Sequence, residues 1–125
     1  MSVLLDSDIV IEILRSRDQG ILSQWEALAN TGRPILFSPI GAAEVWAGAH
    51  PREFQATSLL FSHLVCIPVE YNIGQLAGEF LRQFNKSHNL KIGDALMAAS
   101  AVQCHAALWT RNRKHYPMTQ LTFYS

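Results

Sequence analysis

The sequence predicts an α/β fold whose parallel sheet is covered by helices on both faces. Short apolar runs, each the length of a buried strand, alternate with longer runs in which apolar residues recur at helical spacing. Parallel strands buried on both faces are apolar almost throughout, because neither face meets water. The expected strands cover residues 3–5, 35–37, 64–67 and 107–109, and residues 121–123 can add an edge strand.

The segments between the strands predict helices with recognisable ends. Ser7 and Asp8 can cap a helix over residues 9–14, and a Thr-Gly pair ends a second helix over about 21–30. Ser38 can cap a third helix, with Pro39 in its first turn and an end near residue 49. Further helices are expected over about 53–61 and 71–86, and the last one, rich in small residues, holds Asp94.

Length, composition and charge narrow the class of protein. The chain has 125 residues, of which 49% are apolar, so we expect one domain with a real core over residues 1–125. Ten Lys and Arg balance ten Asp and Glu, which gives no support for bulk attraction to nucleic acid or to an acidic membrane. Any basic surface must therefore be local.

Cysteines and the start of the chain indicate a cytoplasmic protein. Cys66 and Cys104 lie in apolar surroundings without metal-type spacing, so we interpret both as buried, reduced thiols. Asp6 and Asp8 interrupt the apolar start, so we expect no signal peptide. No apolar run reaches the roughly 18 residues that a membrane span needs.

Three acidic residues stand in apolar company. Asp6 follows the first strand, Glu44 lies inside its helix among apolar neighbours, and Asp94 stands near a helix start among apolar ones. An ionised carboxylate in such surroundings costs several kcal/mol unless it is paired or binds a metal. Helix capping is the alternative for each, and it explains Glu44 least well. Asp8 can either join such a site or cap the first helix, and we favour the cap.

If the three carboxylates converge, they form an all-oxygen site that selects Mg²⁺ or Mn²⁺ over Zn²⁺. Clustered carboxylates repel one another, and a cation is what makes the cluster tolerable. Such a site suits phosphoryl chemistry, because the metal orients a water, lowers its pKa and neutralises charge on the phosphate.

The segment after the fourth strand carries the densest basic cluster of the chain. Its Thr110 and Asn112 offer neutral oxygens near a metal, and its cationic side chains suit phosphate binding. The alternative is a solvated loop, which spacing alone favours. Arg82 and Lys91 can add to this basic edge, although each suits a surface role. The candidate phosphate contacts in this segment are Arg111, Arg113, Lys114 and His115.

Four motifs, in their order along the chain, resemble those of a known family. They are LLDSD at residues 4–8, SPIGAAEVWAG at 38–48, IGDALMAA at 92–99 and LWTRNRKHY at 108–116. Together they resemble the PIN-domain ribonucleases, specifically the VapC-type toxins of type II toxin–antitoxin systems. Each motif alone is weak, whereas four in this order are specific. The resemblance covers nearly the whole chain.

The resemblance implies a three-layer α/β/α sandwich with a four- or five-stranded, mainly parallel sheet. It also implies Mg²⁺- or Mn²⁺-dependent endonuclease cleavage of RNA by a metal-activated water, with Asp6, Glu44 and Asp94 as the acids. Many family members have an Asp at the fourth polar position. This chain departs from that pattern and offers Asn112, with His115 a little further on.

The resemblance further implies partners: an RNA substrate, a homodimer and a small antitoxin that lies over the active-site groove. Trp46 and Phe61 can line that groove, although core packing is the simpler role for each. Two other functions stay open. The Asp-Ser-Asp opening also resembles phosphatases of the haloacid dehalogenase type with Asp6 as nucleophile, and a catalytically silent module that only binds RNA or protein is possible.

Overall fold

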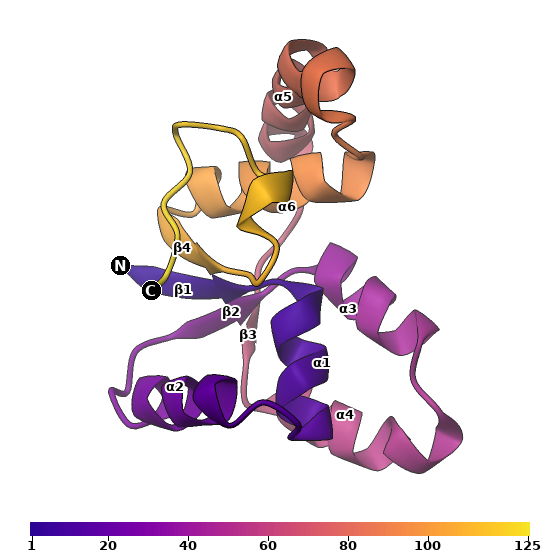
Figure 1. Ribbon diagram of the computed structural model, residues 1–125, viewed down its shortest axis with the longest axis vertical. Helices are drawn as coiled ribbons and strands as arrows, with labels where there is room; N and C mark the ends of the chain where they lie inside the picture. The colour runs from indigo at the N-terminus through magenta and orange to yellow at the C-terminus, as the bar shows by residue number, and fades with distance from the viewer.

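The computed structural model describes all 125 residues and has a four-stranded parallel sheet at its centre (Figure 1). The strands are β1 (Ser2–Leu5), β2 (Ile35–Phe37), β3 (Val65–Cys66) and β4 (Ala106–Trp109), in the order β3-β2-β1-β4. This confirms the parallel sheet expected from the alternation of strands and helices. The tail does not form a fifth strand, because Phe123 makes only an isolated parallel bridge to Leu108.

Helices cover both faces of the sheet and complete three layers (Figure 1). On one face lie α5 (Tyr71–His88) and α6 (Ile92–Gln103). On the other lie α1 (Ser7–Arg15) and α2 (Gln19–Ala29), with α3 (Pro39–Ala47) and α4 (Phe54–Ser62) beside α1. Short 3₁₀ turns, η1 (Pro51–Glu53) and η2 (Arg113–His115), precede α4 and follow β4.

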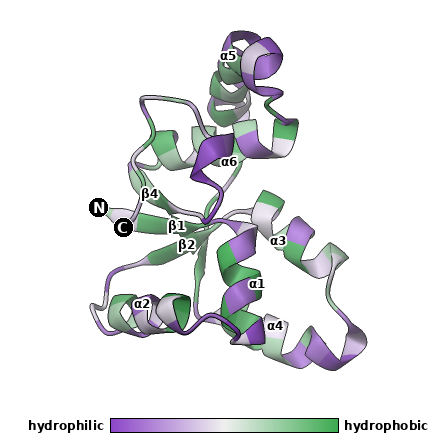
Figure 2. Ribbon diagram, viewed as in Figure 1, coloured by the Kyte–Doolittle hydropathy of each residue, from purple (hydrophilic) through white to green (hydrophobic).

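Alternation along the strands divides the core into two. Leu4 and Leu108 point toward the α5–α6 layer, whereas Val3, Leu5 and Trp109 point toward α1 and α2. In Figure 2 the strands are green and the exposed turn after β4 is purple. Strands β1, β2 and β4 are largely shielded from water, so the polar residues that matter for a site lie at the strand ends.

The order of the strands fixes where those polar residues meet. β2 and β3 follow on one side of β1, whereas β4 lies on the other, so the strand order reverses between β1 and β4. Ligands bind outside the carboxyl ends of parallel strands at such a point. Asp6 follows β1 there and Thr110 follows β4, while Ser38 follows β2 next to them.

Some details differ from the sequence-based expectations. β3 is shorter than predicted, and Cys66 within it is exposed rather than buried, because β3 lies at the edge of the sheet. Cys104 is half-buried, and both cysteines are free thiols. None of the helices has the length and apolar character required to cross a membrane.

Candidate active site

Asp6 is the centre of the site and also the N-cap of α1. Its Oδ1 accepts a hydrogen bond from the Ser7 backbone N–H at 2.8 Å. Its Oδ2 accepts two more, from the Thr110 hydroxyl at 2.9 Å and the Tyr116 hydroxyl at 2.7 Å. The expectation that Ser7 and Asp8 cap this helix is therefore wrong, because the residue that ends the strand supplies the cap itself.

Tyr116 joins Asp6 to Asp94 and was not predicted from the sequence. It is buried, and its hydroxyl lies 2.7 Å from Asp6 Oδ2 and 3.5 Å from Asp94 Oδ1. Burial and the Asp6 charge raise the pKa of Tyr116 far above its ordinary value, so the phenol stays protonated and donates. A buried tyrosine usually needs a partner for its hydroxyl, which is the only signal that the sequence offered.

Asp94 approaches the site from the first turn of α6. Burial and then the charge of Asp6 raise its pKa, while the nearby cationic groups of His115 and Lys91 act in the opposite direction. Four buried alanines give α6 short side chains, so the helix can pack closely against the sheet. They are Ala95, Ala98, Ala99 and Ala101. The short side chains therefore bring Asp94 to the carboxyl end of β1.

Glu44 reaches the same site from α3. The residue is exposed, but loss of hydration beside the other acids and then the charge of Asp6 raise its pKa, with smaller contributions from Asp94 and Asp8. The Ser38 hydroxyl caps α3 by accepting the Gly41 N–H at 3.1 Å, as the sequence predicted. Gly41 also lets the helix approach α6, since a Cβ there would lie only 3.3 Å from Met97 Cε.

The donor chemistry of this cluster fits a divalent cation such as Mg²⁺ or Mn²⁺. Asp6, Glu44 and Asp94 supply oxygen ligands only, and each charge opposes ionisation of its neighbours. Asp8 borders the cluster, and its Oδ1 is buried with no hydrogen-bond partner. No three acidic, histidine or cysteine side chains are already arranged to hold one metal ion, so binding would have to draw the mutually repelling carboxylates together.

Asp8 holds the segment after β4 instead of capping a helix. Its Oδ2 accepts the Arg111 backbone N–H at 2.9 Å and the Asn112 side-chain amide at 3.2 Å. Asn112 thereby lies beside Asp8, whereas His115 lies near Asp94. The two candidates for the fourth polar position thus border the site next to different acids.

Glu12 is a second residue that the sequence analysis missed. Only 3% of it is exposed, and its Oε2 accepts from Arg17 at 3.0 Å and from Arg111 at 3.2 Å. The predicted phosphate contact Arg111 therefore lies against α1 in this structure. The sequence did contain a signal, because Glu12 interrupts the apolar run over residues 9–14.

The other predicted phosphate-binding residues lie apart from one another in the structure. The Arg113 guanidinium contacts the Tyr124 carbonyl at 3.0 Å and lies over the Phe123 ring, 5.1 Å from its centroid. Lys114 is exposed in η2, and Arg82 is exposed on α5, without a hydrogen bond or ion pair to the acids.

A polar cavity adjoins the acid cluster on the α6 side. It has a volume of about 160 Å³ and shares Asp94 with the cluster. The buried Leu90 anchors the loop that forms one wall. The other lining residues are His88, Asn89, Lys91 and His115, so the cavity places cationic groups beside Asp94.

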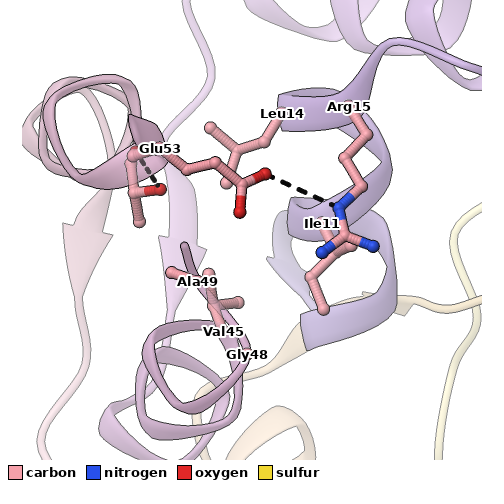
Figure 3. A pocket seen from close by; sticks show the side chains of 8 residues that line it. Ile11, Leu14, Arg15, Val45, Gly48, Ala49 and Glu53 are labelled. Atoms are coloured by element: carbon pink, nitrogen blue, oxygen red, sulfur yellow. Dashed lines mark hydrogen bonds and ion pairs between the residues drawn. The ribbon is translucent and has the colours of Figure 1, made fainter. Parts of the chain in front are cut away.

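An apolar pocket lies between α1, α3 and α4 (Figure 3). Figure 3 shows Ile11 and Leu14 on one side, Val45 and Ala49 on the other, and the Arg15–Glu53 ion pair across its rim at 3.7 Å. The expected groove residue Trp46 is 37% exposed and lies edge-on to Phe54, with ring centroids 5.5 Å apart. Phe61 is instead half-buried and packs against Phe37, as the core alternative predicted.

Comparison with known proteins identifies the class to which this fold and site belong. A family model described as "PIN domain" matches residues 3–119. The chain therefore belongs to the PIN-domain family, as the four motifs predicted.

Individual relatives are named VapC. Ribonuclease VapC19 of Mycobacterium tuberculosis is 32% identical over 116 residues, which cover 92% of each protein. Ribonuclease VapC10 of the same species is 31% identical over 119 residues, or 93% of this chain and 86% of that protein. Among solved structures, a chain of VapBC2 from Rickettsia felis is 26% identical. That structure contains a DNA fragment from the VapBC2 promoter. Its TM-score is 0.80, and the match covers 99% of this chain and 98% of that one.

Proposed function

We propose that this protein is a Mg²⁺- or Mn²⁺-dependent endoribonuclease that acts as the toxin of a toxin–antitoxin pair. The observation that carries the proposal is the meeting of Asp6 and Asp94 on either side of one buried hydroxyl, with Glu44 electrostatically coupled to both. The names of the VapC relatives support ribonuclease activity. Nothing else in the fold gathers so many acids at the carboxyl ends of the strands.

The proposed chemistry needs no nucleophilic side chain. A divalent cation held by Asp6, Glu44 and Asp94 supplies activation of a water and neutralisation of charge on the phosphodiester. The hydroxyls of Thr110 and Tyr116 both donate to Asp6, but they are poor nucleophile candidates because both residues are buried. Their task is to hold that carboxylate in place. The match of a PIN-domain family model to residues 3–119 argues against the phosphatase alternative.

The cavity beside Asp94 offers a place for the RNA backbone. Lys91, His88 and His115 surround it, so a phosphate next to the cleaved one would meet one ammonium group and two imidazole rings there. Lys114 in η2 is free to add a further contact. This local basic surface would compensate for the zero net charge of the chain.

The apolar pocket of Figure 3 suits the antitoxin. The R. felis neighbour is a VapBC complex, and a Klebsiella pneumoniae neighbour with a TM-score of 0.77 and 25% identity is a toxin–antitoxin complex. We therefore infer that a small antitoxin docks its apolar side chains between α1, α3 and α4. From the membership of the PIN-domain family we also propose that the toxin forms a homodimer. Co-purification with the product of a neighbouring gene and light scattering would test the two inferences separately.

The nuclease proposal is tested by RNA cleavage with purified protein. Cleavage is expected with Mg²⁺ or Mn²⁺, and is expected to stop with EDTA or after Asp94→Asn. The matched control is Glu26→Gln, an acid-to-amide change on the exposed side of α2. Cleavage that survives both EDTA and Asp94→Asn would overturn the mechanism. Calorimetry with Mn²⁺ separates an active enzyme from a silent module, which would bind no cation.

A further inference from the structure

Two acids on successive turns of α1 hold the segment that follows β4. We call this segment, residues 110–112, the post-β4 loop. Asp8 accepts the Arg111 backbone N–H at 2.9 Å and the Asn112 amide at 3.2 Å. Four residues later, Glu12 accepts the Arg111 guanidinium at 3.2 Å. Residues four apart share one helix face, so the two acids form a single edge along the loop.

Glu12 is anchored more firmly than a surface acid. It is 3% exposed, and the same Oε2 also accepts from Arg17 at 3.0 Å. A carboxylate buried to this degree stays charged only when it is paired, and here two guanidinium groups pair it. Because Arg17 follows α1 and Arg111 follows β4, Glu12 joins the end of α1 to the post-β4 loop.

The post-β4 loop is in turn bonded to the acid cluster. The Thr110 hydroxyl donates to Asp6 Oδ2 at 2.9 Å and accepts the Asn112 backbone N–H at 3.1 Å. A shift of the loop would therefore move the hydroxyl that holds Asp6. The chain of contacts runs from the α1 edge through the loop to the central carboxylate.

We propose that Asp8 and Glu12 are positioning residues of the active site, which hold Thr110 against Asp6 and Asn112 at the rim of the acid cluster. Neither has to touch the substrate. The proposal rests on the nuclease function for its effect on the reaction, but the loop it describes can be tested without activity.

The test compares two substitutions at each acid. Asp8→Asn keeps an oxygen that can accept both hydrogen bonds, whereas Asp8→Ala removes it. We expect Asp8→Ala to lower kcat about 10- to 100-fold, the range for residues that orient a metal ligand, with KM little changed. Asp8→Asn should recover most of the rate. Glu12→Gln against Glu12→Ala repeats the comparison, and Glu26→Gln on α2 is the control.

Amide hydrogen exchange supplies the readout that does not need activity. Exchange at Arg111 should be slow in the wild-type protein and in Asp8→Asn, and faster in Asp8→Ala, while α2 stays unchanged. Mn²⁺ titration should show binding in both variants. Loss of Mn²⁺ binding in Asp8→Ala and Asp8→Asn alike would make Asp8 a ligand and overturn the proposal.

Unchanged exchange and unchanged cleavage in Asp8→Ala would also overturn it. A wild-type protein that cleaves no RNA with Mg²⁺ or Mn²⁺ contradicts the nuclease function instead. In that case the exchange comparison still decides whether the two acids hold the loop. The two failures are thus distinguishable.

Discussion

At the scale of the residue, Asp6 has two roles, and a single substitution would remove both at once. It caps α1 through Oδ1 and belongs to the acid cluster through Oδ2. Asp6→Ala should lose activity and also about 1–3 kcal/mol of unfolding free energy, because the cap is lost and two buried hydroxyl donors lose their acceptor. Asp6→Asn retains a capping oxygen but turns an amide donor toward the hydroxyls of Thr110 and Tyr116, so it should be inactive and recover only part of the lost stability in urea unfolding. Wild-type cleavage by Asp6→Asn would contradict the role of its charge.

Tyr116 makes a second residue-scale prediction. Its hydroxyl is the group that lies between Asp6 and Asp94. Tyr116→Phe removes this donor with little change in volume, so the two carboxylates should repel each other without a proton between them. We expect Mn²⁺ affinity or kcat to fall about 10- to 100-fold, measured by calorimetry and by RNA cleavage. Equal values for Tyr116→Phe and wild type would assign the tyrosine to packing alone.

The candidate site could be predicted from the sequence only in part. Asp6, Glu44 and Asp94 could be predicted because an acid among apolar residues stands out in the sequence. The structure brings them together at the carboxyl ends of the strands. Tyr116 and Glu12 were missed because their roles depend on hydrogen bonds to residues about 100 positions away in the sequence. An aromatic residue near a strand usually indicates core, and a lone Glu in a helix usually indicates a solvated position.

At the scale of the element, capping decides how well α3 presents Glu44. The Ser38 hydroxyl accepts the buried Gly41 N–H, and no water reaches this point because Ser38 is fully buried. Ser38→Ala should therefore cost about 1–3 kcal/mol, the range for leaving a buried donor without a partner. Urea unfolding measures the loss. Ala42→Ser, on a half-buried position of the same helix, is the control and should change stability little.

Elements with strong local signals were the ones that could be predicted. The Ser-Pro start of α3 and the small-residue pattern of α6 are encoded locally, and both helices form as expected. The two-residue strand β3 and the tail are decided by pairing with distant strands. The apolar tail resembles a strand in sequence, but it forms only a single bridge, between Phe123 and Leu108.

At the scale of the whole molecule, zero net charge limits how RNA can bind. Few phosphates can be contacted at once, because the basic side chains near the site are few and several are paired within the protein. For single strands the logarithm of affinity falls with the logarithm of salt with a slope of about −0.7 per phosphate. We expect a shallow slope of about −1.5 to −2, measured with an inactive Asp94→Asn protein. A slope steeper than about −4 would require a basic surface that this fold lacks.

Burial of the acid cluster, together with repulsion within it, makes a prediction about stability and pH. Asp8, Glu44 and Asp94 have raised pKa values, so the folded chain keeps protons that the unfolded chain releases. Stability from these groups therefore falls as the pH rises from their ordinary values of 3.8 and 4.5 through the raised ones. In EDTA, Glu44→Gln should accordingly melt above wild type at pH 7, and the difference should vanish as the pH falls below about 4.

Adding Mn²⁺ should reverse that order. A ligand that binds only the folded chain stabilises it by about 2.7 kcal/mol at a concentration of 100 Kd. Wild type should gain this stabilisation at pH 7, whereas Glu44→Gln, with one acidic ligand fewer, should gain less and melt below it. Glu26→Gln, which changes charge equally on α2, should follow wild type in both conditions. If Glu44→Gln and wild type gain the same stability from Mn²⁺, Glu44 does not hold the cation, and the repulsion that raises its pKa serves no ligand.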